Sequence, residues 1–217
     1  MTTPEFKPKE NNSAAISTDL ASSSQELGSQ IRHIQESFKT TGFSSFKAIS
    51  IPEIEQAYKT AELLDKVNPT PRRGQTRGVE ILQDYPFDKH AIELMQIVRD
   101  KPLVDCLKML LSEQDLKSGT VLLNNYRPGE MLERHRDGVY RPDLKGVLLI
   151  YLPPTSDTAL HLETRDGKTI NPRLEAGDCI LLHPDIYHWV EPVQSPRRSI
   201  LIEFSDPYHD DRIRGFR

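Results

Sequence analysis

Residues 120–137 read TVLLNNYRPGEMLERHRD, and this stretch decides the fold. It begins with a short β-prone run that ends at Tyr126, passes through a Pro-Gly pair and reaches the triplet His135-Arg136-Asp137. In an extended strand, side chains two positions apart point to the same side, so His135 and Asp137 can reach one metal ion from one wall of a sheet. The stretch therefore predicts strands and places two candidate metal ligands side by side.

The C-terminal half continues this pattern of short strand-like runs punctuated by Gly and Pro. The expected strands are 121–126, 146–152, 159–164, 168–174, 178–183 and 199–204. Asp166-Gly167 predicts a two-residue hairpin turn, and residues 175–178 predict a second reversal. Strands at this spacing, with helices confined to the N-terminal side, favour an α+β protein with a jelly-roll core of the double-stranded β-helix type.

Helical signals dominate the N-terminal half. Apolar residues recur at helical spacing from Ile31 to Phe38, and a short strand is expected at 43–49. Ser50-Ile51-Pro52-Glu53 is a capping box with Pro at the first helical position, so a helix is expected from there to about Asp65. Asp88 caps another helix and Pro102 opens a third.

We therefore expect one catalytic domain over residues 29–217. Its helical part, 29–118, packs on a β-barrel core at 119–206. Residues 1–28 are rich in Ser, Thr, Asn, Pro and Lys and carry few large apolar side chains. Such a segment cannot bury enough apolar surface to offset the entropy of ordering, so we expect a disordered N-terminal tail.

Composition narrows the class of protein. No apolar run approaches the roughly 18 residues needed to span a bilayer, and the N-terminus lacks the pattern of a secretion signal, so we expect a cytoplasmic protein without a membrane partner. The two cysteines, Cys106 and Cys179, suit a reducing compartment and exclude a disulfide framework. A formal net charge of -4 gives no general attraction to nucleic acid. Composition gives no oligomeric state.

A third candidate metal ligand, His188, follows on a later predicted strand. Two imidazoles and one carboxylate suit Fe(II) and leave coordination positions for a keto acid and dioxygen. The His-x-Asp triplet alone also arises by chance. His161 and His183 lie on predicted strands where either can line the pocket, and a third imidazole ligand at His161 would indicate a cupin-like site. The remaining histidines, His33, His90 and His209, are expected at the surface.

The order of the motifs adds specificity to this pattern. Tyr126-x-Pro-Gly, His135-x-Asp137, Gly177-Asp178, His188-x-Val-x-Pro-Val and Arg197-x-Ser199 follow one another within residues 120–206. This order resembles that of the 2-oxoglutarate and Fe(II)-dependent dioxygenase superfamily, with its prolyl-hydroxylase-like and AlkB-like branches. The resemblance implies an enzyme with a double-stranded β-helix core.

The resemblance also implies roles for single residues. His135, Asp137 and His188 would be the iron ligands, and Arg197 would pair with the far carboxylate of 2-oxoglutarate, assisted by Ser199. Arg198 is the alternative to Arg197, because the face that it shares with Ile200, Ile202 and Phe204 can be the inward one. On the strand at 121–126, Tyr126 and Asn124 match positions that hydrogen-bond the co-substrate in several branches. Alternatively, both side chains serve only to pack the sheet.

The implied reaction consumes O2 and 2-oxoglutarate, releases succinate and CO2, and hydroxylates a C–H bond. Asp137 favours hydroxylation, because related halogenases carry a small residue there; demethylation, desaturation and ring closure stay open. The expected prime substrate is a small molecule or an amino-acid-like compound. Loops near the ligands supply the candidate substrate contacts, which are Arg72, Arg73, Arg77, Tyr140, Arg141 and Trp189.

Three other functions stay open. An AlkB-like nucleic-acid demethylase fits Asn124-x-Tyr126-x-Pro-Gly and Pro71-Arg72-Arg73, but residues 200–205 lack the further arginine of those enzymes, which disfavours a nucleic-acid partner. Hydroxylation of a protein side chain, of the prolyl type, is favoured by the segment His188-x-Val-x-Pro-Val. Outside the enzymes, a cupin-like binding module would keep the barrel without turnover.

Overall fold

The computed structural model describes residues 24–47, 49–67, 78–80, 88–98, 107–111, 116–152 and 158–206. Several expectations fall outside these residues and stay predictions: most of the tail at 1–28, the start of the helix at Pro102, and Cys106, His209, Arg72, Arg73 and Arg77. Helix α1, Ser24–Thr41, begins inside the segment that composition assigned to the tail. None of the helices in the described ranges combines the length and apolar character needed to cross a membrane.

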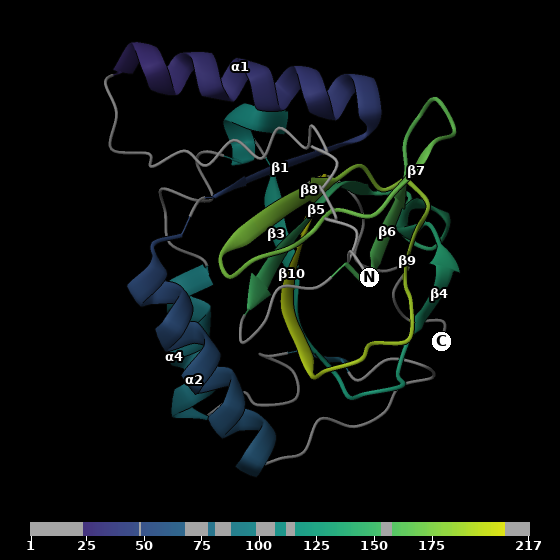
Figure 1. Ribbon diagram of the computed structural model, residues 1–217. Helices are drawn as coiled ribbons and strands as arrows, with labels where there is room; N and C mark the ends of the chain where they lie inside the picture. Colours follow the sequence, from purple (N-terminus) through teal and green to yellow (C-terminus); the bar gives the residue numbers. More distant parts are fainter. Residues whose placement is uncertain are drawn as a thin grey trace, which may run out of the picture.

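A large antiparallel sheet forms one wall of the molecule (Figure 1). Its strands, in spatial order, are β1 (Phe43–Lys47), β8 (Asp178–Leu182), β5 (Leu144–Leu152), β10 (Arg197–Ser205), β3 (Lys117–Tyr126) and β2 (Gly78–Glu80). The last strand of the chain, β10, therefore lies inside the sheet between β5 and β3, so residues far apart in the sequence become neighbours.

A smaller antiparallel sheet faces the large one. Its strands, in spatial order, are β4 (Leu132–His135), β9 (His188–Val190), β6 (Leu160–Glu163) and β7 (Thr169–Ile170). Buried side chains from both sheets, among them Leu149, Tyr151, Leu162 and Val190, form one apolar cluster between them. This arrangement confirms the predicted jelly-roll core of the double-stranded β-helix type.

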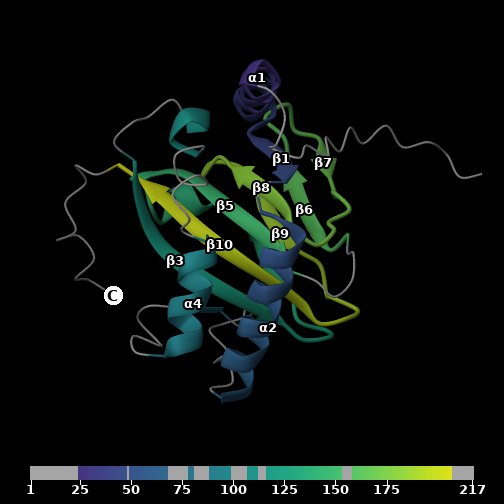
Figure 2. The same ribbon diagram turned by 90° about the vertical axis from the view of Figure 1, so that its left-hand side faces the viewer.

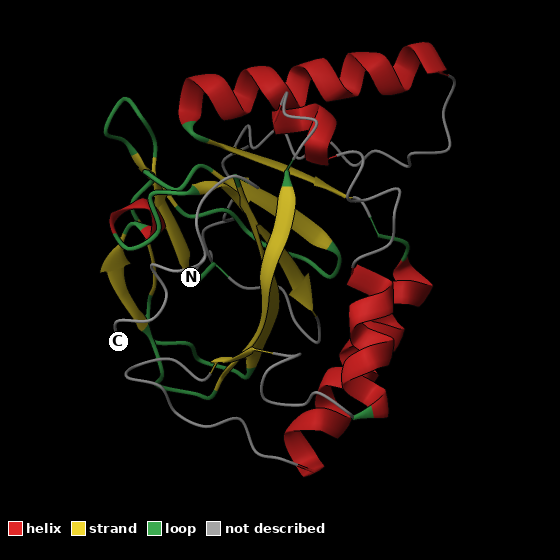
Figure 3. Cartoon of the chain, turned by 180° about the vertical axis from the view of Figure 1, so that it is seen from behind, coloured by secondary structure: helices red, strands yellow, loops and turns green. Residues whose placement is uncertain are grey.

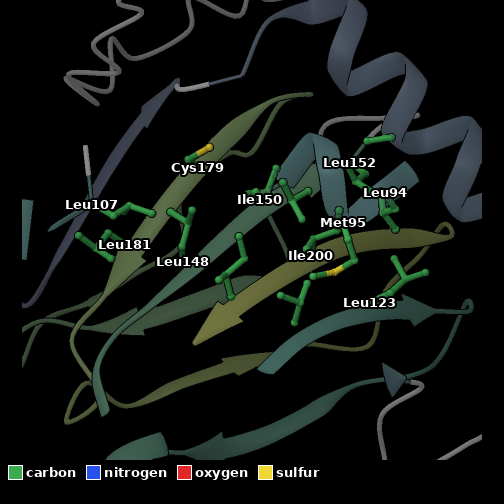
Figure 4. Close-up of a cluster of buried hydrophobic side chains, with 14 of the residues drawn as sticks. Leu94, Met95, Leu107, Leu123, Leu148, Ile150, Leu152, Cys179, Leu181 and Ile200 are labelled. Atoms are coloured by element: carbon green, nitrogen blue, oxygen red, sulfur yellow. The ribbon is translucent and has the colours of Figure 1, made fainter. Parts of the chain in front are cut away.

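The helices lie outside this barrel. Figures 2 and 3 show α2 (Ile51–Val67) and α4 (Lys89–Val98) against the outer face of the large sheet, with α1 beyond its end. Side chains such as Leu94 and Met95 of α4 pack with Leu123 and Ile200 of the sheet (Figure 4). Both faces of the large sheet are therefore buried, one by the helices and one by the smaller sheet.

Local signals explain where these helices begin. Ser50 donates its backbone N–H to Glu53 Oε2 at 3.0 Å, which is one half of the predicted capping box, while its hydroxyl donates to the same carboxylate. Because α2 begins at Ile51, Pro52 is its second residue and not the first as predicted. The Asp88 carboxylate accepts from the backbone N–H of His90 at 2.8 Å and caps α4 as expected.

Two details of the strand predictions were wrong. The hairpin after β6 closes with Thr164 N–H donating to Lys168 C=O at 2.8 Å, so three residues rather than two form its loop. Gly167, the last of them, has φ +81°, the left-handed conformation that this loop length requires. The strand expected at 168–174 contains only β7, because Pro172 has no N–H to donate to a ladder.

Candidate metal centre

Two strands and one turn bring the three predicted ligands together. His135 at the end of β4 pairs in register with His188 on β9. Asp137 opens η1 (Asp137–Val139), a short 3-10 turn, so it does not lie on the strand as the sequence suggested. Arg136 nevertheless keeps an extended backbone, with φ -133° and ψ 132°, and the two side chains that flank it point to the same side.

The distances within this group suit one metal ion. His135 Nε2 lies 3.4 Å from Asp137 Oδ1, and His188 Nε2 lies 3.7 Å from Asp137 Oδ2. One donor atom from each residue lies within 4.8 Å of the other two. Donor atoms about 2.1 Å from one ion and at right angles to each other would be about 3 Å apart. A small movement of the three side chains toward one another would therefore bring their donor atoms to metal-binding distance.

Backbone carbonyls fix the protonation of both imidazoles. His135 Nδ1 lies 2.8 Å from the carbonyl oxygen of Glu133, and His188 Nδ1 lies 3.1 Å from that of Ile186. A carbonyl oxygen only accepts, so each Nδ1 carries a proton, and each Nε2 is turned toward Asp137. Metal-binding histidines are oriented in this way, through a hydrogen bond from the nitrogen that does not bind the metal.

The pKa shifts of Asp137 and His188 suit metal binding. Burial would raise the pKa of Asp137, but the hydrogen bond from His135 and the charge of His188 outweigh burial and lower it. Burial lowers the pKa of His188, which favours its neutral form. Burial also lowers the pKa of His135, but the hydrogen bonds to Asp137 and Glu133 outweigh it and the pKa is raised. An ionised carboxylate beside a neutral imidazole is the state that a divalent metal requires.

A second group of predicted residues lines the barrel interior on β10 and β3. Arg197 is 2% exposed, and its guanidinium carbon lies 5.5 Å from the ring centres of both Tyr126 and Tyr151. Ser199 is fully buried, and its Oγ has no hydrogen-bond partner among the described residues. Asn124 is the register partner of Ser199 on β3 and lies on the same inward face.

Burial extends the pH range in which one member of this group is protonated. It raises the pKa of Tyr126 to about 12, although the charge of Arg197 acts in the opposite direction. The Tyr126 hydroxyl, a hydrogen-bond donor at neutral pH as contact with a carboxylate requires, therefore stays one in alkaline solution.

The two neighbouring arginines point to opposite faces of β10. Arg198 Nε donates to Asn125 Oδ1 at 2.9 Å, and its guanidinium lies 3.7 Å from Glu62 and 4.0 Å from Asp65 on α2. The face that Arg198 shares with Ile200, Ile202 and Phe204 is therefore the one that packs on the helices. The inward face belongs to Arg197 and Ser199.

The remaining candidate residues lie apart from the three ligands. Trp189 and His161 stack on each other on the outer face of the smaller sheet, with ring centres 5.0 Å apart and planes 10° from parallel. Tyr140 is 66% exposed after η1. His183 lies 3.7 Å from Asp185 in the turn before β9 and does not join the metal group.

Arg141 is held in ion pairs with Asp143 and Glu203. The sequence reasoning missed Tyr151, whose only signal was a single hydroxyl in the otherwise aliphatic run of β5, and it missed Glu203 on β10.

A cavity of about 510 Å³ adjoins the turn that carries Asp137. Its lining includes Gly138, Arg141, Lys145 and Pro184, and it contains none of the three candidate ligands. Glycine fits closely there, because a Cβ atom on residue 138 would come within 2.7 Å of Asp185 Oδ1 and 3.2 Å of the Pro184 carbonyl oxygen, so one or both would have to shift. The turn can therefore lie against the segment before His188, where Gly138 N–H donates to the Pro184 carbonyl at 2.8 Å.

Solved structures share this fold. SnoN, a non-heme alpha ketoglutarate dependent epimerase of nogalamycin biosynthesis, is 12% identical with a TM-score of 0.72 over 82% of this chain and 84% of SnoN. A Pseudomonas putida prolyl-4-hydroxylase is 16% identical with a TM-score of 0.63 over 81% of this chain and 98% of that enzyme. The non-heme monooxygenase ThoJ, in a nickel complex, is 23% identical with a TM-score of 0.62 over 81% and 78% of the two chains. No protein-family model and no curated protein matches the sequence.

The fold of this chain is thus the double-stranded β-helix fold of the 2-oxoglutarate and Fe(II)-dependent oxygenases, as the resemblance of its motifs implied. Its His135, Asp137 and His188 form the one group of possible metal ligands found in the described ranges.

Proposed function

We propose that this protein is a 2-oxoglutarate and Fe(II)-dependent oxygenase. One observation carries the proposal: two imidazoles with their Nδ1–H groups bonded to backbone carbonyls direct Nε2 toward the Asp137 carboxylate, in a single three-residue group. This donor set, nitrogen, nitrogen and oxygen, is the one that non-heme Fe(II) oxygenases use. When bound, Fe(II) with 2-oxoglutarate supplies the oxidising chemistry, in which O2 oxidises a substrate C–H bond to C–OH and the keto acid to succinate and CO2.

The chain itself holds and orients the reactants. His135, Asp137 and His188 bind the metal, and the inward face of β10 receives the far carboxylate of 2-oxoglutarate. Arg197 supplies the positive charge for that carboxylate, and the buried Ser199 Oγ supplies a hydroxyl. Tyr126 adds a hydroxyl that stays protonated. Such a buried binding face excludes water, which strengthens the pairing of the two charges.

We further propose that the prime substrate is a small molecule or an amino-acid-like compound and that the reaction is a hydroxylation. The small-molecule class is supported by solved structures of similar fold, which include an epimerase bound to Fe3+, alpha ketoglutarate and nogalamycin RO, and a carbocyclase of the same biosynthesis. Hydroxylation is supported by the carboxylate of Asp137, where related halogenases carry a small residue. We also propose a cytoplasmic location, which the two cysteines of the sequence suit.

A turnover assay tests the proposed activity. Protein loaded with Fe(II) under nitrogen and then exposed to O2 is expected to convert 2-oxoglutarate to succinate, slowly without a prime substrate and faster with one. The His135→Ala variant is expected to lose this conversion. His161→Ala is the matched control, because it removes a strand histidine from the outer face of the same sheet and should leave conversion unchanged. Equal succinate release by His135→Ala and wild type would refute the activity.

The same assay separates the substrate classes. Succinate release is measured with a panel of amino acids and related small molecules, with a proline-containing peptide and with methylated oligonucleotides. Stimulation by members of the small-molecule panel supports our proposal, whereas stimulation by oligonucleotides alone would favour a demethylase. A barrel that binds 2-oxoglutarate without converting it would be a binding module.

A further inference from the structure

A buried ion-pair cluster follows the turn of Asp137, and the proposed chemistry does not use it. Arg141 donates from Nε and Nη2 to the two carboxylate oxygens of Asp143, at 2.9 and 2.8 Å. It also donates from Nη1 to Glu203 Oε2 at 2.8 Å. The side chains of Arg141, Asp143 and Glu203 are 20%, 6% and 17% exposed, so water screens these pairs only weakly.

The cluster links the two halves of the proposed site. The backbone N–H groups of Tyr140 and Arg141 both donate to the carbonyl of Asp137 at 3.0 Å, so Arg141 belongs to the turn that presents this ligand. Glu203 lies on β10, on the same inward face as Arg197 and Ser199. The guanidinium therefore connects the turn that carries a metal ligand to the strand that carries the co-substrate arginine.

Removal of this cation would leave acidic groups facing one another. Burial raises the pKa of Glu203, the charge of Arg141 lowers it, and the charge of Asp137 raises it again. Without Arg141, the carboxylates of Asp143 and Glu203 would share one partly buried region without the cation that now bridges them, which destabilises this arrangement of the turn.

We propose that Arg141 is a positioning residue that fixes the turn of Asp137 to β10 and thereby sets the metal ligand relative to Arg197. This proposal rests on the proposed function. It also replaces the expectation that Arg141 contacts the substrate, because its three guanidinium nitrogens already bind Asp143 and Glu203. A planar guanidinium bridges two carboxylates at once, whereas a lysine ammonium is a point charge that does so poorly.

Two readouts on purified protein test the positioning role. The first is the dissociation constant of Fe(II), measured without oxygen, and the second is hydrogen exchange of the Tyr140 and Arg141 amides in metal-free protein. The variants are Arg141→Met and Arg141→Lys. Arg134→Met is the matched control, because it also removes one positive charge and a 2.7 Å ion pair, with Glu163, but from the outer face of β4.

We expect Arg141→Met to weaken Fe(II) binding by roughly 10- to 100-fold, the usual effect of losing a residue that orients a metal ligand. The two amides should exchange faster, Arg141→Lys should fall between Arg141→Met and wild type, and Arg134→Met should match wild type in both readouts. If Arg141→Met does not fold, the double variant Arg141→Met/Glu203→Gln, which also removes the opposing charge of Glu203, takes its place with the same expectation.

Two results would overturn this inference in distinguishable ways. If wild type binds Fe(II) and Arg141→Met binds it equally well, Arg141 serves only the stability of the fold, and the proposed function is untouched. If wild type itself binds no Fe(II), the proposed function fails and the positioning role fails with it.

Discussion

Replacement of Arg197 by Met separates co-substrate binding from folding. A bidentate guanidinium–carboxylate pair consists of two charge-assisted hydrogen bonds, and hydrogen bonds to charged groups contribute about 1.5–3 kcal/mol each. A loss of about 3 kcal/mol raises the dissociation constant of 2-oxoglutarate by roughly 100-fold. Because Arg197 is 2% exposed between two tyrosine rings, an apolar side chain of similar length fits there, and the variant is expected to fold, as urea unfolding would check.

The adjacent Arg198 provides the control. Its contacts are with Asn125, Glu62 and Asp65 on the helix side, so Arg198→Met should cost about 1 kcal/mol of stability and leave 2-oxoglutarate affinity at the wild-type value. Affinity is measured by calorimetric titration of the Fe(II)-loaded protein without oxygen. A keto acid that lacks the far carboxylate, such as 2-oxobutyrate, should bind wild type and Arg197→Met equally. The reasoning is refuted if Arg198→Met, and not Arg197→Met, loses affinity for 2-oxoglutarate.

Three further predictions concern the turn, the barrel interior and the helix layer. Gly138→Ala should push the turn away from Pro184 and Asp185 and weaken Fe(II) binding, as measured by titration, and unchanged binding would show that this contact does not place Asp137. The pKa of Tyr126 is raised from 10.0 to about 12, so the folded state keeps a proton that the unfolded state loses, and stability should fall as pH rises through that window. Tyr126→Phe should remove that part of the decline in urea unfolding, and an unchanged pH dependence would contradict the shift. Asp88→Ala should lower stability by about 1 kcal/mol through loss of the α4 cap, and any change in Fe(II) binding would show that the helix layer and the site are not independent.

The sequence predicted that His135 and Asp137 lie together because their relation is local. His135 and Asp137 flank one extended residue, and this spacing places them together even though the strand ends at His135. The sequence also predicted the helix starts at Ser50 and Asp88, because a cap depends on neighbours within one turn.

The sequence did not predict which face of β10 points into the barrel. A strand buried on both sides offers no contrast between an apolar inner face and a polar outer face, so the alternation of Arg197 and Arg198 left the inward one open. The structure places the apolar face, with Ile200 and Ile202, against the helices and the more polar one inside the barrel. Only the position of the helix layer, which depends on contacts distant in sequence, decides this.

The sequence also did not predict contacts between residues that lie far apart in the chain. The pairing of Arg141 with Glu203 and the stacking of Trp189 on His161 each join residues from separate strands or loops. Trp189 directly follows the candidate ligand His188, but alternation along β9 turns it to the outer face, away from the three candidate ligands. The role of Arg72, Arg73 and Arg77 stays a prediction, since these residues lie outside the described ranges.

The binding of one metal ion by three side chains is tested most directly by a crystal structure with Mn(II), a stand-in for Fe(II) that resists oxidation by air, and 2-oxoglutarate. We predict one anomalous peak bonded to Nε2 of His135 and His188 and to the Asp137 carboxylate, with the keto acid on the same ion and its far carboxylate at Arg197. A metal ion bound elsewhere, or a keto acid whose far carboxylate does not contact Arg197, would refute the proposed site.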